Sequence, residues 1–125
     1  MGQPRARRQR KAKKQLRLVV AGACAIAART APIKEVMRDA AATEPAVRAL
    51  VREDHARRRR TQEALVRMLA ERRRLRRGID VQRAVDMFFA VVNSSTYELL
   101  VGYRGWTHSE WQDWLVDVLE RELFG

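Results

Sequence analysis

The feature that most restricts the fold of this chain is the segment from Pro45 to Arg77, which holds nothing that would end a helix. It has no glycine and no further proline, and strong helix formers (alanine, leucine, arginine and glutamate) dominate it. Proline is well tolerated in the first turn of a helix, so Pro45 marks a start. The segment predicts one helix of up to about nine turns, with Gly78 as its end. In a chain of 125 residues, this favours an all-α domain.

The same segment is apolar at both ends and polar in the middle. Apolar residues recur at helical spacing before Arg52 and again from Leu65 onward. Between them lies "REDHARRRRTQE", in which the positions of the apolar stripe fall on polar residues, namely Asp54, His55, Arg58, Thr61 and Gln62. The polar middle is therefore expected either to face water or to line a cavity with polar sides.

Further helices are expected on both sides of this segment, giving a helical bundle of about five to six. Leu16–Arg29 carries an apolar helical stripe, and Thr30-Ala31-Pro32 predicts a break followed by a second short helix. Asp80 is a suitable cap for a helix starting at Val81, and Asn93–Thr96 predicts a break or kink after it.

The last helix is predicted to begin at Thr107, within a stretch that gathers all three tryptophans. Thr107 and Glu110 have the spacing of a capping box, and Trp106 and Trp111 occupy the two positions of a hydrophobic staple. Apolar residues lie on more than one face of this helix and of the helix from Val81. Such helices are covered on more than one side, which favours a partner subunit. The simpler alternative is an ordinary core around Trp111 and Leu115.

Charge divides the chain unevenly. Residues 1–34 hold ten Lys or Arg and no acidic residue, whereas residues 81–125 hold three basic and seven acidic residues. Residues 1–15 lack apolar periodicity and are expected to form a disordered basic arm, with residues 16–125 forming the folded domain.

No arrangement of residues for catalysis, metal binding or phosphate binding is apparent. The only cysteine, Cys24, lies in an apolar run and is interpreted as a small buried hydrophobe. The sequence therefore predicts neither an enzyme nor a cofactor. The apolar run after the arm imitates a secretory signal, but Arg17 and Gly22 interrupt it, and a cytoplasmic protein without a membrane span is expected.

Two stretches resemble the C-terminal domain of the tetracycline-repressor (TetR/AcrR) family of transcriptional regulators. "YELLVGYRGWTHSEWQDWLVDVLERELF", from Tyr97 to Phe124, is similar to the end of many such proteins, and "GIDVQRAVDMFFAVVNSSTYELL" is similar to the helix before it. The likeness extends over about Leu16 to Phe124. It departs from the family at the start, because fifteen residues cannot form the three helices of the operator-reading helix-turn-helix domain. A start assigned too late, a truncated gene or another role for the arm are the alternatives.

The resemblance implies a domain that binds a small apolar or planar effector and forms a homodimer through its last two long helices. DNA would then be bound through the missing helix-turn-helix. The residues expected to line the ligand pocket are Met37, His55, Arg58, Thr61, Met68 and Phe88. Those expected at the dimer interface are Phe89, Tyr97, Leu100, Trp106, Trp114 and Val118.

The alternative function is that of a small basic helical protein that binds nucleic acid without sequence preference. Its contacts with phosphate would come from the arm, through Arg5, Arg7, Arg8, Arg10, Lys11, Lys13 and Lys14. No aromatic residue is interleaved with these charges, so stacking on single strands is not expected.

Overall fold

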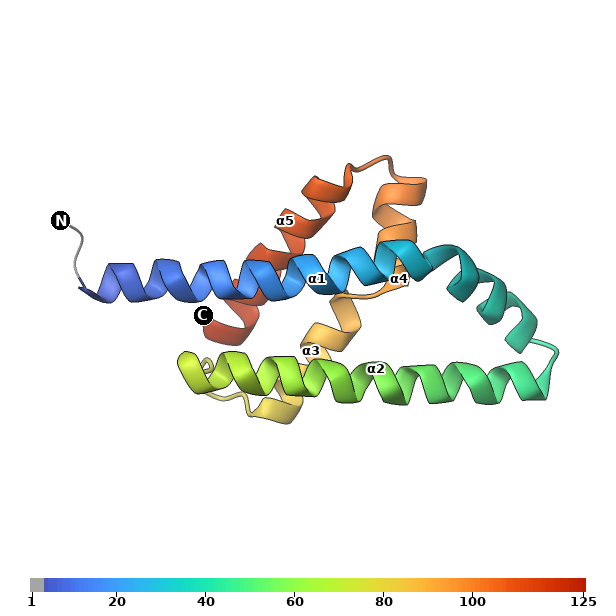
Figure 1. Ribbon diagram of the computed structural model, residues 1–125, viewed down its shortest axis with the longest axis horizontal. Helices are drawn as coiled ribbons and strands as arrows, with labels where there is room; N and C mark the ends of the chain where they lie inside the picture. Colours follow the sequence, from blue (N-terminus) through green and yellow to red (C-terminus); the bar gives the residue numbers. More distant parts are fainter. Residues whose placement is uncertain (1–3) are drawn as a thin grey trace.

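The computed structural model describes residues 4–125, and this part of the chain is helical without strands (Figure 1). The elements are α1 (Pro4–Ala41), α2 (Pro45–Arg72), α3 (Val81–Val91), α4 (Ser94–Tyr97), the π-helical segment η1 (Glu98–Tyr103), α5 (His108–Leu119) and the π-helical segment η2 (Glu120–Phe124). The all-α class is confirmed. Only four α-helices in the described range exceed a single turn, fewer than the five to six expected.

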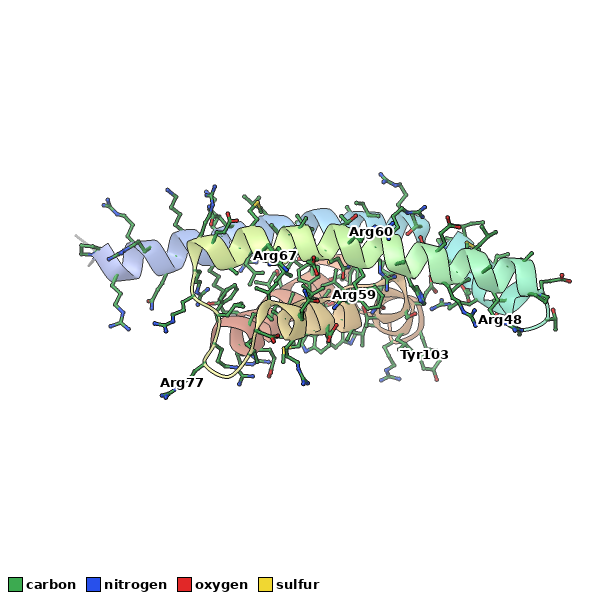
Figure 2. All side chains as sticks on the ribbon, turned by 90° about the horizontal axis from the view of Figure 1, so that it is seen from below. Arg48, Arg59, Arg60, Arg67, Arg77 and Tyr103 are labelled. Atoms are coloured by element: carbon green, nitrogen blue, oxygen red, sulfur yellow. The ribbon has the colours of Figure 1, made fainter. Side chains whose placement is uncertain are left out.

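The helices form two layers. α1 and α2 run antiparallel in one layer, and α3 to α5 form the other layer beneath them (Figures 1 and 2). The core lies between the layers, where α1 contributes Leu16, Val20 and Cys24, and α5 contributes Trp111 and Leu115, all fully buried. The predicted core around Trp111 and Leu115 is thus enclosed within one chain.

The expected break at Pro32 does not occur, which explains the smaller number of helices. Pro32 lies inside α1, which continues to Ala41. Proline lacks the N–H that would bond to the preceding turn, and its ring clashes with the carbonyl there, so a helix that continues past a proline is bent. α1 changes direction in its last third (Figure 1). The hydroxyl of Thr30 also donates to the carbonyl oxygen of Ile26 at 2.8 Å.

The basic arm is a helix in the described residues 4–15, not a disordered segment. These residues form the first turns of α1 and contribute nothing to the core, which begins at Leu16. The acidic end of the chain lies against them: Lys13 approaches Asp117 at 3.9 Å, and Arg17 pairs with Asp113 at 3.1 Å. The basic start of α1 and the acidic helix α5 thus lie close together, above a core that both helices share. Residues 1–3 lie outside the described part.

α2 ends at Arg72, earlier than the expected Arg77. The chain then turns toward the C-terminus, where the N–H of Arg76 donates to the carbonyl oxygen of Leu123 at 2.6 Å, and Arg73 pairs with Glu120. Gly78 still serves a turn, because its φ of +93° lies in the left-handed region that favours glycine.

The caps predicted at Asp80 and Thr107 are confirmed. Asp80 accepts from the N–H of Arg83 at 2.8 Å. After the expected break, Asn93 caps α4, a cap that was not predicted. Thr107 and Glu110 form the reciprocal capping box, with N···O distances of 3.0 and 2.9 Å.

Candidate ligand-binding groove

A cavity lies between α1 and α2. α1 presents small residues toward α2, among them Gly22, Ala23 and Ala27, and small side chains cannot fill the gap between two long helices. A cavity of about 590 Å³ remains, within the range of small-molecule sites. Its walls come from α1 and α2, and its floor comes from the junction between α3 and α4, residues Val92, Asn93 and Ser94.

Gly22 marks the empty part of this cavity. A Cβ atom built at this position would meet no heavy atom within 4 Å. Ile26, one turn further along α1, is more than half exposed and also lines the cavity. The α1 wall is thus apolar and accessible.

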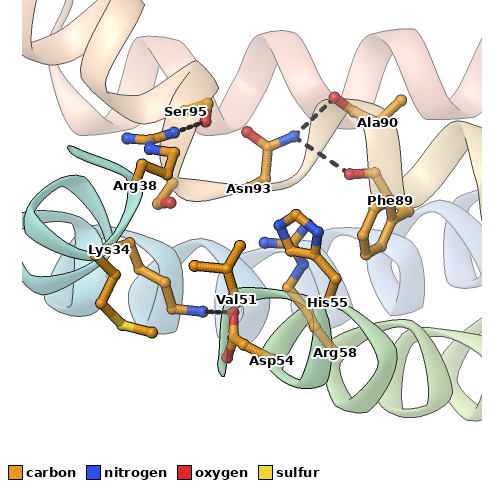
Figure 3. Close-up of a pocket in the computed structure, with 12 residues that line it drawn as sticks. Lys34, Arg38, Val51, Asp54, His55, Arg58, Phe89, Ala90, Asn93 and Ser95 are labelled. Carbon is orange, nitrogen blue, oxygen red and sulfur yellow. Dashed lines mark hydrogen bonds and ion pairs between the residues drawn. The ribbon is translucent and has the colours of Figure 1, made fainter. Parts of the chain in front are cut away.

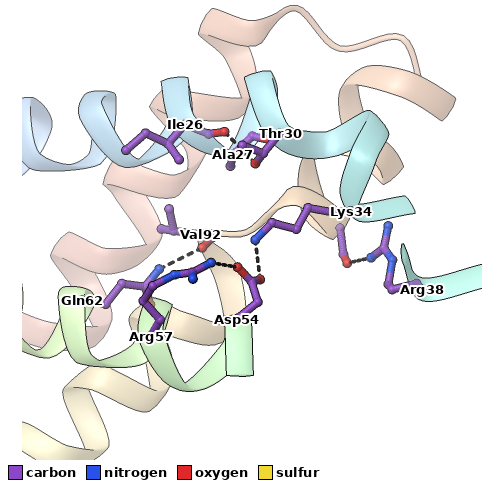
Figure 4. A network of polar contacts seen from close by, with 10 residues as sticks. Ile26, Ala27, Thr30, Lys34, Arg38, Asp54, Arg57, Gln62 and Val92 are labelled. Carbon is purple, nitrogen blue, oxygen red and sulfur yellow. Dashed lines mark hydrogen bonds and ion pairs between the residues drawn. The ribbon is translucent and has the colours of Figure 1, made fainter. Parts of the chain in front are cut away.

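The polar middle of α2 forms the opposite wall. Asp54 pairs there with Lys34 of α1 and, at 2.9 Å, with Arg57 of its own helix (Figure 4). Burial alone would raise the pKa of Asp54, but the hydrogen bonds and charges of Lys34 and Arg57 outweigh it and hold the pKa below its usual value. Asp54 is therefore an ionised carboxylate that ties α1 to α2.

A second, smaller cavity of about 260 Å³ adjoins the first. Lys34, Asp54, Arg58, Asn93 and Ser94 line both, so the two cavities share one polar wall. Figure 3 shows the smaller cavity, where Arg38 also donates to the hydroxyl of Ser95. We call the two cavities together the groove.

Arg58 lies at the centre of the groove. Its guanidinium carbon is 4.2 Å from the centroid of the Phe89 ring, and His55 meets the same ring edge to face at 5.9 Å. Burial lowers the pKa of Arg58, yet guanidinium groups stay charged in proteins. Burial, followed by the charge of Arg58, lowers the pKa of His55, so that this ring is neutral at pH 7.

Two buried polar atoms in the groove have no hydrogen-bond partner among the described residues. They are Nε of Arg58 and Oε1 of Gln62. Gln62 is 4% exposed and lines the larger cavity, and its Nε2 donates to the carbonyl oxygen of Val92 at 3.3 Å. Unpaired buried polar atoms are costly, and both of these belong to residues that line the larger cavity.

The structure brings together four of the six residues predicted for the pocket. Met37, His55 and Arg58 line the smaller cavity, and Arg58 and Thr61 line the larger one. Met68 lies outside both and is 40% exposed, while Phe88 is fully buried in the core.

The groove also contains residues absent from the predicted pocket set, among them Lys34, Arg38, Asp54, Arg57 and Gln62. Asp54 and Gln62 had a signal, because both fall on the interrupted stripe of α2. Lys34 had none, because its position depends on α1 continuing past Pro32.

The residues predicted for the dimer interface are divided between two places. Phe89, on α3, lines the smaller cavity of the groove. Tyr97, Leu100 and Trp106 are partly buried against the core, and Val118 is partly buried. Trp114 is 38% exposed, and its ring meets that of Trp106 at 6.0 Å.

Two exposed apolar residues of η1 were not predicted. Leu99 is 60% exposed and Tyr103 is 79% exposed, and Tyr103 points away from the body of the molecule (Figure 2). Leu99, Tyr103 and Trp114 are the exposed large apolar residues of the second layer, and we call them together the outer face.

The basic residues of the predicted arm lie on α1 outside the groove. Arg5, Arg7, Arg8, Arg10, Lys11 and Lys14 are exposed, and Lys13 is partly buried. By length and composition alone α1 is also able to cross a membrane, although one of its faces lies in the core. Within residues 4–125 no cluster of three His, Cys, Asp or Glu is placed to hold a metal ion.

Comparisons with protein-family models, with curated proteins and with solved structures found no match to this chain.

Proposed function

We propose that this chain is a small-molecule-binding domain, the effector-sensing and dimerising part of a TetR-like cytoplasmic regulator. The observation that carries the proposal is the groove. It combines an apolar α1 wall, a cavity of about 590 Å³ and two buried polar atoms without partners. Sites for small molecules have this composition, mostly apolar with a few convergent polar groups.

The position of the groove also suits signalling. Its floor at Val92–Ser94 is the break between α3 and α4. Because a ligand touching this break would also bias the helices that lead to the outer face, binding and subunit association would be coupled. The residue pattern of Tyr97–Phe124, which resembles the dimer-forming end of the TetR family, supports the same proposal.

Gly22 offers a direct test. Gly22→Met would place a side chain in the empty part of the groove without changing a polar residue, and Gly22→Ala is the matched control with a single methyl group. Thermal unfolding of each protein would be followed with a panel of apolar and planar compounds. We expect at least one compound to raise the Tm of the parent and of Gly22→Ala but not of Gly22→Met. A panel that stabilises none of them, or all three equally, contradicts the proposal.

A second candidate function is binding of nucleic acid by the basic start of α1. The supporting observation is that six of its seven basic residues are exposed on a helix, and that a helix presents them at fixed spacing. Such contacts involve phosphate, and binding therefore falls steeply with salt. A gel-shift titration of unrelated duplexes at two salt concentrations tests it. Equal, salt-sensitive affinities support the candidate, and absence of binding at low salt rejects it.

A further inference from the structure

The charges that surround the groove are strongly unbalanced. Lys34, Arg38, Arg57 and Arg58 all line it, whereas Asp54 is the only carboxylate among its described lining residues. Asp54 is already shared between Lys34 and Arg57. The groove therefore holds more positive than negative charge, which favours an anionic occupant.

Arg58 is one of two groove cations that form no ion pair among the described residues; the other, Arg38, donates to the hydroxyl of Ser95. The Nε of Arg58 is buried without a hydrogen-bond partner among residues 4–125. Its guanidinium is held in place by the Phe89 ring at 4.2 Å. A positioned and partly buried guanidinium without an anion is suited to bind a carboxylate.

Gln62 adds a second requirement. It lies one helical turn after Arg58, and both line the larger cavity. The unpaired Oε1 of Gln62 only accepts hydrogen bonds, so a ligand must bring a hydroxyl or N–H group to it.

From this placement we infer that the groove binds an amphipathic organic acid whose carboxylate pairs with Arg58, whose adjacent hydroxyl or N–H group donates to Gln62, and whose apolar body lies along the α1 wall at Gly22 and Ile26. This inference deepens the proposed function and rests on it. A neutral apolar compound would bind more weakly, because it leaves both polar atoms of the groove unpaired.

Three probes with the same ten-carbon chain separate these contributions: 3-hydroxydecanoate, decanoate and 1,3-decanediol. The diol retains hydroxyl groups but lacks the charge, and decanoate lacks the hydroxyl. Binding to the parent protein would be measured by titration calorimetry. We expect the hydroxy acid to bind about ten- to hundredfold more tightly than the diol. It should also bind at least about threefold more tightly than decanoate.

Variants assign these differences to residues. Arg58→Met keeps an apolar contact with Phe89 and should remove the preference for the acid over the diol. Arg60→Met is the matched control, because Arg60 lies on the same helix, is exposed and lines neither cavity (Figure 2). Gln62→Met should remove the preference for the hydroxy acid over decanoate. This preference is the ratio of the two dissociation constants, and a general loss of affinity would leave that ratio unchanged.

The outcomes separate the inference from the proposed function. If all three probes bind the parent equally and Gly22→Met abolishes the binding, the groove is a ligand site but the inference is wrong. If Arg58→Met and Arg60→Met weaken acid binding equally, the attraction is the general charge of the protein, and the inference is again wrong. If no probe binds the parent, the result contradicts the inference, while a neutral compound that requires an open Gly22 would still support the proposed function.

Discussion

The indole N–H of Trp111 donates to the hydroxyl oxygen of Thr96 at 3.2 Å, and this hydroxyl donates to the carbonyl oxygen of Val91 at 2.7 Å. The two bonds connect the fully buried ring of α5 to the break between α3 and α4. The first bond satisfies the indole N–H, the only polar group of the Trp111 side chain, and the second satisfies the hydroxyl of Thr96.

Replacing Thr96 by valine should destabilise the fold. Valine has nearly the same shape as threonine but no hydroxyl, so the indole N–H stays buried without an acceptor. We expect Thr96→Val to lower the free energy of unfolding by about 1–3 kcal/mol in urea titrations. Thr96→Ser, which keeps the hydroxyl and loses only a methyl group, should cost less. Equal losses in the two variants would show that the bond does not matter.

Gly22→Ala should stabilise the protein. Gly22 lies within α1, and the added methyl group meets no atom within 4 Å. Alanine restricts the unfolded chain and favours the helix, so the free energy of unfolding should rise by about 0.5–1 kcal/mol. The measurement is again urea unfolding, followed by the far-UV circular dichroism of the helices. A loss of stability would mean that α1 lies closer to α2 than the cavity implies.

Local signals in the sequence predicted much of this fold. The caps at Asp80 and Thr107 depend on contacts between residues three apart, so a single stretch of sequence specifies them. The apolar stripe of α2 is likewise interrupted by polar residues in the sequence itself, and this interruption predicted the polar middle of the helix. These features need no knowledge of the rest of the chain.

The features that prediction missed depend on tertiary packing. Pro32 predicts a break, but α1 continues past it, where Lys34 pairs with Asp54 and Arg38 donates to Ser95. Phe88, predicted for the pocket, lies in the core, and Phe89, predicted for the dimer interface, lies in the groove. The two are neighbours about 100° apart around α3, so their places depend on how the helix is rotated against its neighbours. The basic start of α1 becomes ordered in a structure where Asp113 and Asp117 lie close to it, which no local pattern indicates.

The thiol of Cys24 should be unreactive in the native protein. Cys24 is fully buried, and burial raises its pKa to about 12. The reactive thiolate is therefore scarce at neutral pH. We expect slow labelling by Ellman's reagent at pH 8 in the native protein and rapid, complete labelling in urea. Fast labelling without denaturant would indicate that α1 separates readily from the core.

Asp54 should make stability depend on pH in the acidic range. Its folded-state pKa lies below the unfolded value of about 3.9. A carboxyl group with a lowered pKa contributes stability above the unfolded pKa, and this contribution is lost as the pH falls through the folded pKa. Asp54→Asn should therefore cost about 1–3 kcal/mol at pH 7, because Lys34 loses its partner in a partly buried site, and much less near pH 2.

Urea titrations of the parent and the variant across this pH range provide the check. Asp39→Asn is a suitable control, since Asp39 is exposed near the end of α1 and forms no ion pair among the described residues. It should leave the difference between pH 7 and pH 2 unchanged. A constant deficit for Asp54→Asn at every pH would show that the loss does not come from the carboxylate charge.

The outer face should hold two copies of the chain together. Leu99 and Tyr103 are 60% and 79% exposed, and Trp114 is 38% exposed. Large apolar side chains gathered on a small domain mark an interaction surface. We expect light scattering at micromolar concentration to give twice the 14.5 kDa of one chain. Leu99→Glu should return the mass to that of one chain, because a charge buried at such an interface would lack a partner.

Leu50→Glu is the matched control for this test. Leu50 is 53% exposed but lies on α2, in the other layer. The same change there adds an equal charge without touching the outer face, so the mass should stay that of two chains. Since Trp111 is enclosed within a single chain, the core does not require a partner, and a dimer must arise from the side chains left outside. If light scattering gives the parent protein the mass of one chain, the prediction that the outer face holds two copies together is wrong.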